Sequence, residues 1–475
     1  MLDLTSFRRE AHALVDWMAD YLETVDSYPV KARTAPYEIF NKLPDTPPEN
    51  SEPFKKIMND FVAHILPGMT HWQHPRFFAY FPANSSYASV LGEMLTATLG
   101  AQCMIWETSP AAAELEEKMM NWLKEMLDLP REWDGVMQDT ASAATLCAIL
   151  SAREKKSGFT SNQQGLNGTR YRVYCSTQTH SSIDKAVRIA GLGTDHLVKV
   201  AVDDKLAMQP ETLRQAIEQD RRKGYTPLCV IATFGTTGTT AIDPLAPIAP
   251  ICREQDVWLH VDAAYAGTAL ILPEYRSLAS GLEHADSFVF NPHKWMFTNF
   301  DCSAYFVRDK ATLIRTFEIL PEYLKTGQRG QVNDYRDWGI ALGRRFRALK
   351  LWFVIRDFGV AGIRKRLREH IALARQVEQW MREEAACECM APAPFNALFF
   401  RWHPKKLTAT DELNRFNARL LQTLNDSGRL YLTHTRINDT FIIRMVIGQT
   451  YVREEHVRKA WRHIKETAQK LSAEL

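Results

Sequence analysis

Two apolar runs of the sequence end in residues whose types could carry chemistry. Lys294 follows Asn291, Pro292 and His293 directly after the run SFVF, and Asp262 ends the run VWLHVD, 32 residues upstream. If both runs are strands, an amine lies at the tip of one and a carboxylate at the tip of another. That pair suits pyridoxal phosphate, because a lysine forms a Schiff base with the cofactor aldehyde and a carboxylate keeps the pyridine nitrogen protonated. The pair therefore predicts an enzyme built around this cofactor.

The neighbours of both residues support this prediction. Lys294 stands beside the aromatic residues Trp295 and Phe297, and an enclosed lysine is desolvated, so its amine is more easily neutral and nucleophilic. Asp262 is followed by small residues, of which Ala264 would face a flat ring without crowding it. Alone, each has a simpler explanation, since lysines often end strands at a solvated surface and aspartates often cap helices.

Two hydroxyl-rich loops are candidates for the cofactor phosphate, which needs N–H and O–H donors at a helix start. The segment 138–146 offers Thr140 and Ser142 before an apolar helix, and the segment 232–240 (ATFGTTGTT) follows a strand-like run. Neither matches a nucleotide-binding motif. His180 also lies between a strand-like run and a helix; such a histidine is usually structural, but an imidazole stacked on a pyridinium ring would be useful.

The elements that would position these residues alternate along the middle of the chain. Helical stretches are expected near 88–99, 111–127, 141–155, 182–190, 209–223 and 244–255, and strands at YRVYC, HLVKVAV, LCVIATF, VWLHVD, SFVFN and SAYFV. Such alternation predicts an α/β domain with a mainly parallel sheet, whose ligands gather where strands end.

The flanking regions differ from this middle part. A helix at 5–24, a Pro-rich linker at 29–53 and a helix at about 54–65 come first, and long charged helices with two strand-like runs come last. We expect three parts: an N-terminal helical dimerisation segment (1–85), a large cofactor domain (86–351) and a small α+β domain (352–475).

The composition excludes several classes of partner. Hydrophobic residues make up 45% of the 475 residues, charged residues 24%, and the net charge is +2, so neither nucleic acid nor an acidic membrane surface is expected to bind. No run approaches the roughly 18 apolar residues of a membrane span, and the charged N-terminus does not resemble a signal peptide. The eight cysteines show no metal-ligand pattern and favour a reducing cytoplasm.

Five segments in this order, HWQHPRFFAYFP, THSSIDKA, HVDAAYAG, SFVFNPHKW and NFDCSAYFV, resemble the aromatic-L-amino-acid decarboxylase family of group II pyridoxal-phosphate decarboxylases. The resemblance extends over about residues 5–472. It implies fold type I of the cofactor enzymes, with a seven-stranded, mainly parallel sheet, and a homodimer whose active sites lie at the subunit interface.

The resemblance also implies roles for individual residues. Lys294 matches the Schiff-base lysine, Asp262 the partner of the pyridine nitrogen, His180 the histidine stacked on the ring, and Tyr323 a mobile-loop tyrosine that protonates Cα. The remaining cofactor contacts implied are Ala141, Ser142, Thr237, Ala264, Asn291 and His293.

The expected substrate pocket is aromatic. Its expected lining comprises Trp72, Tyr80, Phe81, Pro82, Gln102, Met104, Phe300 and Gly343, whereas we expect the neighbouring Phe78 to pack at the subunit interface. Plant relatives carry glycine at the position of Gly343 for indolic substrates and serine for phenolic ones, which favours tryptophan, although dopa-acting relatives also carry glycine. The implied activity is decarboxylation of tryptophan, phenylalanine, tyrosine or dopa to the arylalkylamine.

Three alternatives remain open. An aromatic aldehyde synthase uses oxygen on the same substrates, but such relatives typically replace the loop tyrosine with phenylalanine or the stacking histidine with asparagine, and this chain keeps Tyr323 and His180. A decarboxylase for acidic or aliphatic amino acids should need a basic pocket. A non-catalytic binding protein would have no reason to keep Lys294 and Asp262.

Overall fold

The computed structural model describes residues 2–319, 330–391 and 393–475, which form two compact units. The first unit comprises Met1–Pro82, Ala372–Met390 and Leu398–Leu475, and the second comprises Ala83–Ile371 and Ala391–Ala397. The three-part division expected from the sequence stays a prediction.

The second unit is built on a seven-stranded sheet with the order β1-β7-β6-β5-β4-β2-β3. Strands β2 to β6 run parallel, and β7 is antiparallel to both β6 and β1, so that β1 points the same way as the parallel set. The strands are β1 (Asp134–Gln138), β2 (Tyr171–Ser176), β3 (Leu197–Val200), β4 (Thr226–Thr233), β5 (Trp258–Asp262), β6 (Ser287–Phe290) and β7 (Ser303–Val307).

This sheet confirms the α/β fold expected from the sequence, since all six expected runs form strands. β1 was not expected, because its sequence DGVMQ contains a glycine and polar ends that are rare in strands. Gly135 is required there: a Cβ on it would lie 2.5 Å from Met120 Cε and 2.8 Å from the Phe306 ring.

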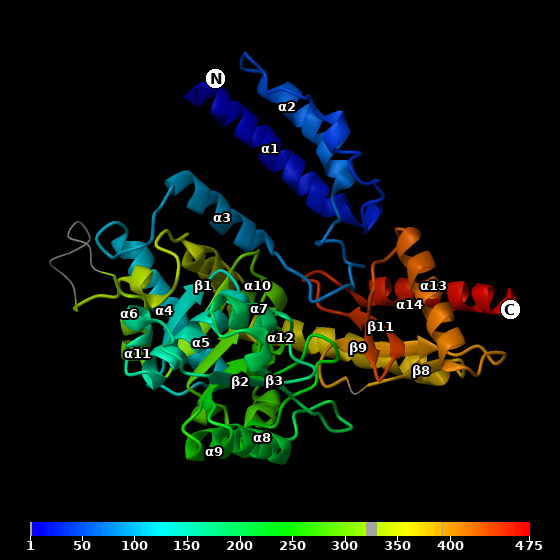
Figure 1. Ribbon diagram of the computed structural model, residues 1–475. Coiled ribbons are helices and arrows are strands. Elements are labelled where there is room, and N and C mark those ends of the chain that lie inside the picture. The colour runs from blue at the N-terminus through cyan, green and yellow to red at the C-terminus, as the bar shows by residue number, and fades with distance from the viewer. Residues whose placement is uncertain (1, 320–329, 392) are drawn as a thin grey trace. The chain divides into compact units, whose positions relative to one another are not determined.

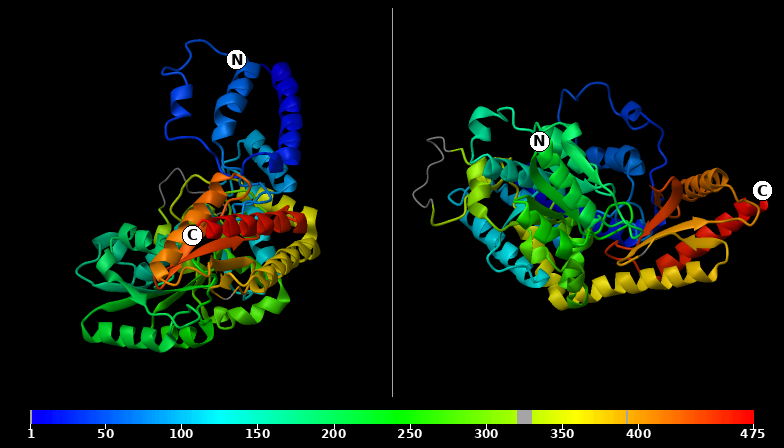
Figure 2. Two further views of the ribbon diagram at one scale, coloured as in Figure 1. Left: turned by 90° about the vertical axis from the view of Figure 1, so that its right-hand side faces the viewer. Right: turned by 60° about the horizontal axis from the view of Figure 1, so that its bottom comes forward.

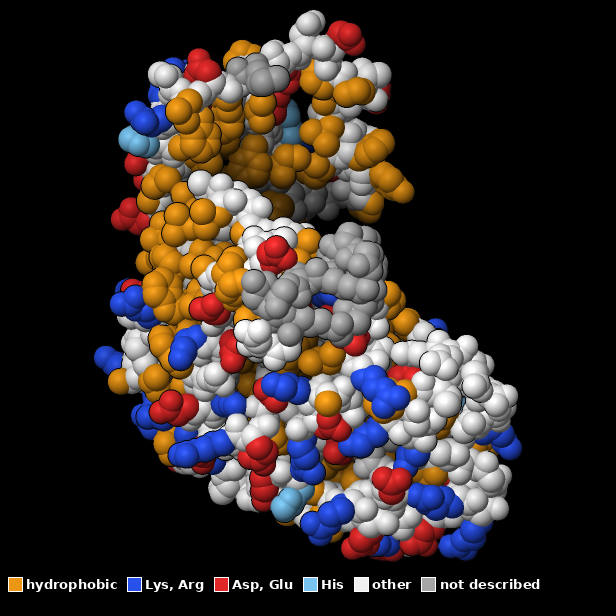
Figure 3. All heavy atoms as spheres, turned by 90° about the vertical axis from the view of Figure 1, so that its left-hand side faces the viewer, with side chains coloured by type: hydrophobic (Ala, Val, Ile, Leu, Met, Phe, Trp, Pro, Cys, Tyr) orange, Lys and Arg blue, Asp and Glu red, His pale blue; other side chains and the backbone are white. Residues whose placement is uncertain are grey.

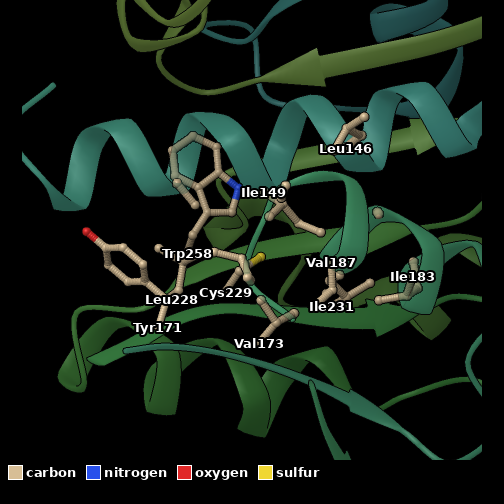
Figure 4. Packing of buried hydrophobic residues seen from close by; sticks show 14 of the residues in the cluster. Leu146, Ile149, Tyr171, Val173, Ile183, Val187, Leu228, Cys229, Ile231 and Trp258 are labelled. Atoms are coloured by element: carbon tan, nitrogen blue, oxygen red, sulfur yellow. The ribbon is translucent and has the colours of Figure 1, made fainter. Parts of the chain in front are cut away.

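Helices cover both faces of the sheet (Figure 1). The helices of the second unit are α3 (Tyr87–Leu99), α4 (Pro110–Leu127), α5 (Ala141–Lys156), α6 (Ser161–Gln164), α7 (Ser182–Ile189), α8 (Pro210–Arg222), α9 (Leu245–Glu254), α10 (Pro292–Trp295) and α11 (Lys310–Phe317), and α12 (Arg347–Glu383) begins in this unit and ends in the first. Figure 4 shows α5 and α7 packed on one face, where Ile149 and Val187 meet Val173 and Ile231 from the strands. Tyr174, which alternates with Val173, points to α8 and donates a 2.9 Å hydrogen bond to Asp220. The sheet is therefore buried on both faces, as parallel sheets are.

The first unit contains a four-stranded sheet in the order β10-β11-β9-β8, in which β11 packs on α13, and α13 in turn packs on α14 (Figure 2). Its strands are β8 (Cys387–Cys389), β9 (Ala397–Trp402), β10 (Thr433–Ile437) and β11 (Thr440–Val446), and its helices are α1 (Leu4–Thr24), α2 (Phe54–Asp60), α13 (Thr410–Asp426) and α14 (Glu454–Ala473). The segment around Phe78 is tied to this sheet, because its N–H donates to the Tyr431 carbonyl (3.0 Å) and its carbonyl accepts the Val446 N–H (2.9 Å). Phe78 is fully buried within the chain, so the expectation that it packs at a subunit interface is wrong.

Several apolar surfaces are left uncovered within the chain. None of the 21 residues of α1 is buried, although the helix carries Leu4, Phe7 and Val15. Figure 3 shows hydrophobic side chains gathered on one face. Along α3 the exposed large apolar residues recur three or four positions apart, as one helical stripe: Tyr87, Leu91, Met94, Leu95 and Leu99. No helix among the described residues is long and apolar enough to span a membrane.

Candidate active site

The candidate residues of the second unit gather at one edge of the large sheet. The carboxyl ends of β1, β2, β4, β5 and β6 share this edge, and β7 begins there. The segments that follow these strands carry Ala141 and Ser142 (after β1), His180 (after β2), Thr237 (after β4), Asp262 and Ala264 (at β5), and Asn291, His293 and Lys294 (after β6). Ligands of such sheets bind at this edge.

Lys294 lies on the single helical turn α10, which follows β6. Its N–H donates to the Asn291 carbonyl at 2.9 Å, and the Asn291 N–H donates to the Ala264 carbonyl at 3.0 Å, which ties the turn to the end of β5. Burial lowers the pKa of Lys294, and the negative charge of Asp262 acts in the opposite direction. The amine is thus more readily neutral than that of an exposed lysine, as the sequence predicted.

Asp262 is the last residue of β5, in the middle of the sheet and only 6% exposed. It lies opposite Thr233 of β4 on one side and Val289 of β6 on the other. Its Oδ1 accepts the Ala264 N–H at 3.0 Å, which orients the carboxylate. Fixed in this way, the other oxygen can accept a hydrogen bond from a protonated ring nitrogen.

His180 is held by Ser182 at the start of α7. The ring Nδ1 accepts the Ser182 N–H at 3.1 Å and lies 2.9 Å from the Ser182 hydroxyl, so the neutral ring carries its proton on Nε2. Desolvation lowers the pKa of His180, with a smaller raising effect from Asp262 and a lowering effect from Lys294. All three residues stand at or just after parallel strands (β2, β5 and β6) whose carboxyl ends share one edge of the sheet.

His293 and Asn291 present donors at the same edge. Burial, helped by the neighbouring Lys294 charge, lowers the pKa of His293 to about 3, so the ring is neutral. The Asn291 Oδ1 accepts the Ser303 hydroxyl at 2.6 Å, which turns the NH₂ group of Asn291 the other way. Ser303 gave no signal in the sequence beyond its place in a strand.

The start of α5 is the place where the sequence analysis expects the cofactor phosphate. Thr140 caps the helix, since its hydroxyl oxygen accepts the Ala143 N–H at 3.2 Å, and the Asp139 carboxylate accepts the Thr140 N–H at 2.6 Å. Ser142 is exposed in the first turn, where backbone N–H groups and the helix dipole favour a phosphate. Thr237 is also exposed, in the turn after β4.

These residues fit pyridoxal phosphate. The edge holds a desolvated amine, a buried carboxylate with one oxygen oriented by the backbone N–H of the small residue Ala264, and a helix start with hydroxyl groups. Bound there, the aldehyde would meet Lys294, the pyridine nitrogen Asp262, and the phosphate the start of α5.

The expected substrate residues of the first unit form an aromatic group. The Trp72 ring stacks on the Tyr80 ring at 5.9 Å, and the Tyr80 hydroxyl lies 3.3 Å from that of Tyr431, a residue that the sequence analysis missed. Phe81 is buried with the Arg444 guanidinium 5.4 Å from its ring, and Pro82 is buried too.

The other expected substrate residues lie in the second unit. Gln102 Oε1 accepts the Arg344 N–H at 2.8 Å, and a Cβ on Gly343 would lie 3.3 Å from Gln102 Nε2. The Met104 carbonyl accepts the Arg336 N–H at 2.9 Å. Phe300, which is exposed, covers the His293 ring with centroids 4.8 Å apart. Tyr323 lies outside the described residues.

An α/β fold with a desolvated lysine and a buried carboxylate at its strand ends indicates a pyridoxal-phosphate enzyme, and comparison with known proteins specifies its family. Residues 36–403 match the pyridoxal-dependent decarboxylase conserved domain. The chain belongs to this family of enzymes, and its cofactor is pyridoxal phosphate.

Relatives share almost the whole length of the chain. Tyrosine decarboxylase 1 of Narcissus pseudonarcissus is 41% identical, with 98% of this chain and 93% of the relative covered. Phenylacetaldehyde synthase of Petunia hybrida is 40% identical, with 98% and 95% covered. The crystal structure of Oryza sativa TDC with PLP and tryptamine superimposes with a TM-score of 0.96 at 35% identity, covering 99% of both chains. These similarities confirm fold type I and the family that the sequence motifs indicated.

Proposed function

We propose that this enzyme decarboxylates aromatic L-amino acids (tryptophan, phenylalanine, tyrosine or dopa) to the corresponding arylalkylamines and CO₂. The observation that carries the proposal is the meeting of Lys294, Asp262 and His180 at one edge of the sheet. The match to a tyrosine decarboxylase and to a structure containing tryptamine supports an aromatic substrate. The stacked Trp72 and Tyr80 rings offer flat apolar faces for an aromatic ring.

Bound pyridoxal phosphate supplies an electron sink for the pair of electrons left on Cα when the bond to the carboxylate breaks. Lys294 contributes a desolvated amine that exchanges protons near neutral pH more readily than an ordinary lysine. The Asp262 carboxylate, at the end of β5, would stabilise a proton on a ring nitrogen. His180 offers its Nε2–H on the side of the ring away from Ser182.

Protonation at Cα completes the reaction, and we propose Tyr323 as the donor, with His180 as a relay. The remaining cofactor contacts that we propose are Ala141, Ser142, Thr237, Ala264, Asn291 and His293.

We also propose that the enzyme works as a homodimer with active sites shared between subunits. A 21-residue helix with no buried residue gains stability only when something covers its apolar side chains, and the apolar stripe of α3 needs a cover as well. A second copy of the chain carries the same two apolar surfaces, on α1 and on α3, and could cover those of the first copy. The eight cysteines, all free thiols, fit the proposed reducing cytoplasm.

Product analysis tests the proposed activity. The purified, cofactor-loaded enzyme is given equal amounts of tryptophan, phenylalanine, tyrosine, dopa and glutamate in air. The expected products are aromatic amines without stoichiometric hydrogen peroxide, and their ratio ranks the substrates. Amine formed mainly from glutamate would contradict an aromatic specificity.

A second candidate function is aromatic aldehyde synthesis, which the 40% identity to a phenylacetaldehyde synthase favours. Aldehyde and peroxide in the same assay would support it. The matched variants Tyr323→Phe and His180→Asn are expected to raise peroxide per CO₂ if the native residues protonate Cα before oxygen reacts. If wild type already forms peroxide stoichiometrically, these two residues are not the discriminators.

A further inference from the structure

We propose that Asn84 is a positioning residue that fixes the backbone of Lys294. Asn84 makes two hydrogen bonds to consecutive residues of the α10 turn: its backbone N–H donates to the His293 carbonyl at 3.0 Å, and its side-chain NH₂ donates to the Lys294 carbonyl. The side chain of Asn84 therefore contacts the very residue that the cofactor chemistry needs, although 210 positions separate them in the sequence.

The shape of α10 explains why this contact matters. A helix leaves its last four carbonyls without partners inside the helix, and α10 has only four residues. Of these carbonyls, Pro292 accepts the Met296 N–H at 3.3 Å, whereas those of His293 and Lys294 point to Asn84. Buried carbonyls need partners, and here one residue supplies both.

Other bonds hold the turn from its other side. The His293 N–H donates to the Cys302 carbonyl at 3.2 Å, and the Lys294 N–H donates to the Asn291 carbonyl at 2.9 Å. With Asn84 on the carbonyl side, the peptide groups around Lys294 are fixed in both directions. Asn84 is only 1% exposed, so water does not replace its side-chain bond readily.

The consequence concerns the reach of the lysine. The amine of Lys294 must reach the cofactor aldehyde, and it must also move aside when the substrate amine takes its place. The position of the Lys294 Cα determines whether the amine can reach both places. A shift of about 1 Å at a reacting group lowers rates by about 100-fold. Asn84 acts through Lys294 and needs no contact with the cofactor itself.

The inference rests on the assignment of Lys294 as the cofactor-holding lysine, which is tested separately. Borohydride reduction of the wild-type holoenzyme fixes the cofactor on its lysine, and peptide mass identifies that residue. A label on another lysine would remove the basis of the inference, independently of any Asn84 result.

Three substitutions test Asn84. Asn84→Ala and the isosteric Asn84→Asp both remove the donor to the Lys294 carbonyl but keep the backbone N–H, and Asn84→Ser keeps a donor on a shorter side chain. We expect Ala and Asp to lower kcat by about 10- to 100-fold with little change in KM. They should also shift the pH midpoint of the lysine-bound cofactor absorbance and weaken cofactor affinity, with Ser intermediate.

Asn417→Ala is the matched control. Asn417 is fully buried in the first unit, and its NH₂ donates to the carbonyls of Trp402 and Leu413 at 2.8 Å. Its loss should lower the melting temperature without moving the absorbance midpoint. If the Asn84 variants change only the melting temperature, as Asn417→Ala does, or change nothing, Asn84 is structural and the proposal is wrong. If Ala and Asp do not fold, an unchanged absorbance midpoint and kcat in Asn84→Ser overturn it.

Discussion

His293 and Cys302 hold each other through two hydrogen bonds, since the His293 N–H donates to the Cys302 carbonyl at 3.2 Å and the Cys302 N–H donates to His293 Nδ1 at 2.9 Å. An Nδ1 that accepts leaves the ring proton on Nε2. Burial lowers the pKa of His293 to about 3. Three more buried histidines, His74, His260 and His370, also have a pKa of about 3, for the same main reason.

These histidines predict that the fold is sensitive to acid. Their pKa in the folded chain lies below the ordinary value of 6.5, so the unfolded chain binds more protons below pH 6.5. Their stabilisation is present above that pH and is lost as the pH falls towards 3. Each histidine gives a slope of up to about 1.4 kcal/mol per pH unit, and the four together give up to about 5.6 kcal/mol per pH unit. Urea unfolding at about pH 7.5, 6.5 and 5.5, at one protein concentration, measures this slope.

A pair of variants isolates one histidine. His370 Nδ1 accepts the Trp295 Nε1–H at 3.0 Å, and an asparagine oxygen can accept in its place. His370→Asn should therefore reduce the slope by about one proton, whereas His284→Asn, at an exposed position, should leave the slope as it is. Equal slopes in both variants would show that His370 is not a source of the acid sensitivity.

Asp243 should change the pH dependence of the unfolding free energy in the direction opposite to the histidines. Its buried carboxylate accepts the N–H groups of Met208 and Thr233, both at 2.7 Å, and burial raises its pKa to about 6. Its stabilisation is therefore present below about pH 4 and lost as the pH rises through 6. Asp243→Asn, with one acceptor oxygen for two N–H groups, should be less stable by about 1–3 kcal/mol at low pH.

The difference between wild type and Asp243→Asn should then shrink by about 3 kcal/mol between about pH 4 and 7. Unfolding free energies across that range measure the change. A constant difference would mean that Asp243 does not titrate there. In wild type, the slope that Asp243 contributes runs opposite to that of the four histidines.

Gly92 should tolerate no side chain. A Cβ there would lie 2.8 Å from Lys350 Cα, and backbone cannot move aside as a flexible side chain can. We expect Gly92→Ala to destabilise the chain by about 1–3 kcal/mol. Gly362→Ala is the control, because its Cβ would meet only Phe358 Cβ at 3.6 Å and alanine favours a helix by about 1 kcal/mol. Melting temperatures that move in the same direction would contradict the close contact of α3 with α12.

Asp262→Asn should separate charge from structure. The asparagine oxygen can still accept the Ala264 N–H, so melting should change little, but the charge that stabilises a ring proton is gone. We expect kcat to fall by about 10²- to 10³-fold, and Asp262→Glu, which keeps the charge, to fall less. Activity of the Asn variant within a few-fold of wild type would remove Asp262 from its proposed role.

Three central residues of the candidate site, Lys294, Asp262 and His180, could be predicted from the sequence. Each stands at or after an apolar run that forms a strand, and the carboxyl ends of parallel strands share one edge of a sheet. The sequence did not indicate β1, whose polar ends and Gly135 mask a short strand that only pairing with β7 makes regular. Asn84 was missed for another reason: its partners are backbone carbonyls, which have no sequence signature. Tyr431 meets Tyr80 only through the packing of distant segments.

The pairing of β1 with β7 also sets the order in which the protein can be built. Asp134 of β1 lies opposite Val307 of β7, so β1, which precedes α5, stays unpaired until a partner 173 residues further along the chain has been made. At a synthesis rate of about 5–20 residues per second this wait lasts roughly 9 to 35 s. During that time the nascent chain exposes an unpaired strand edge, and the vitamin-derived cofactor can bind only late, after most of the large domain has left the ribosome.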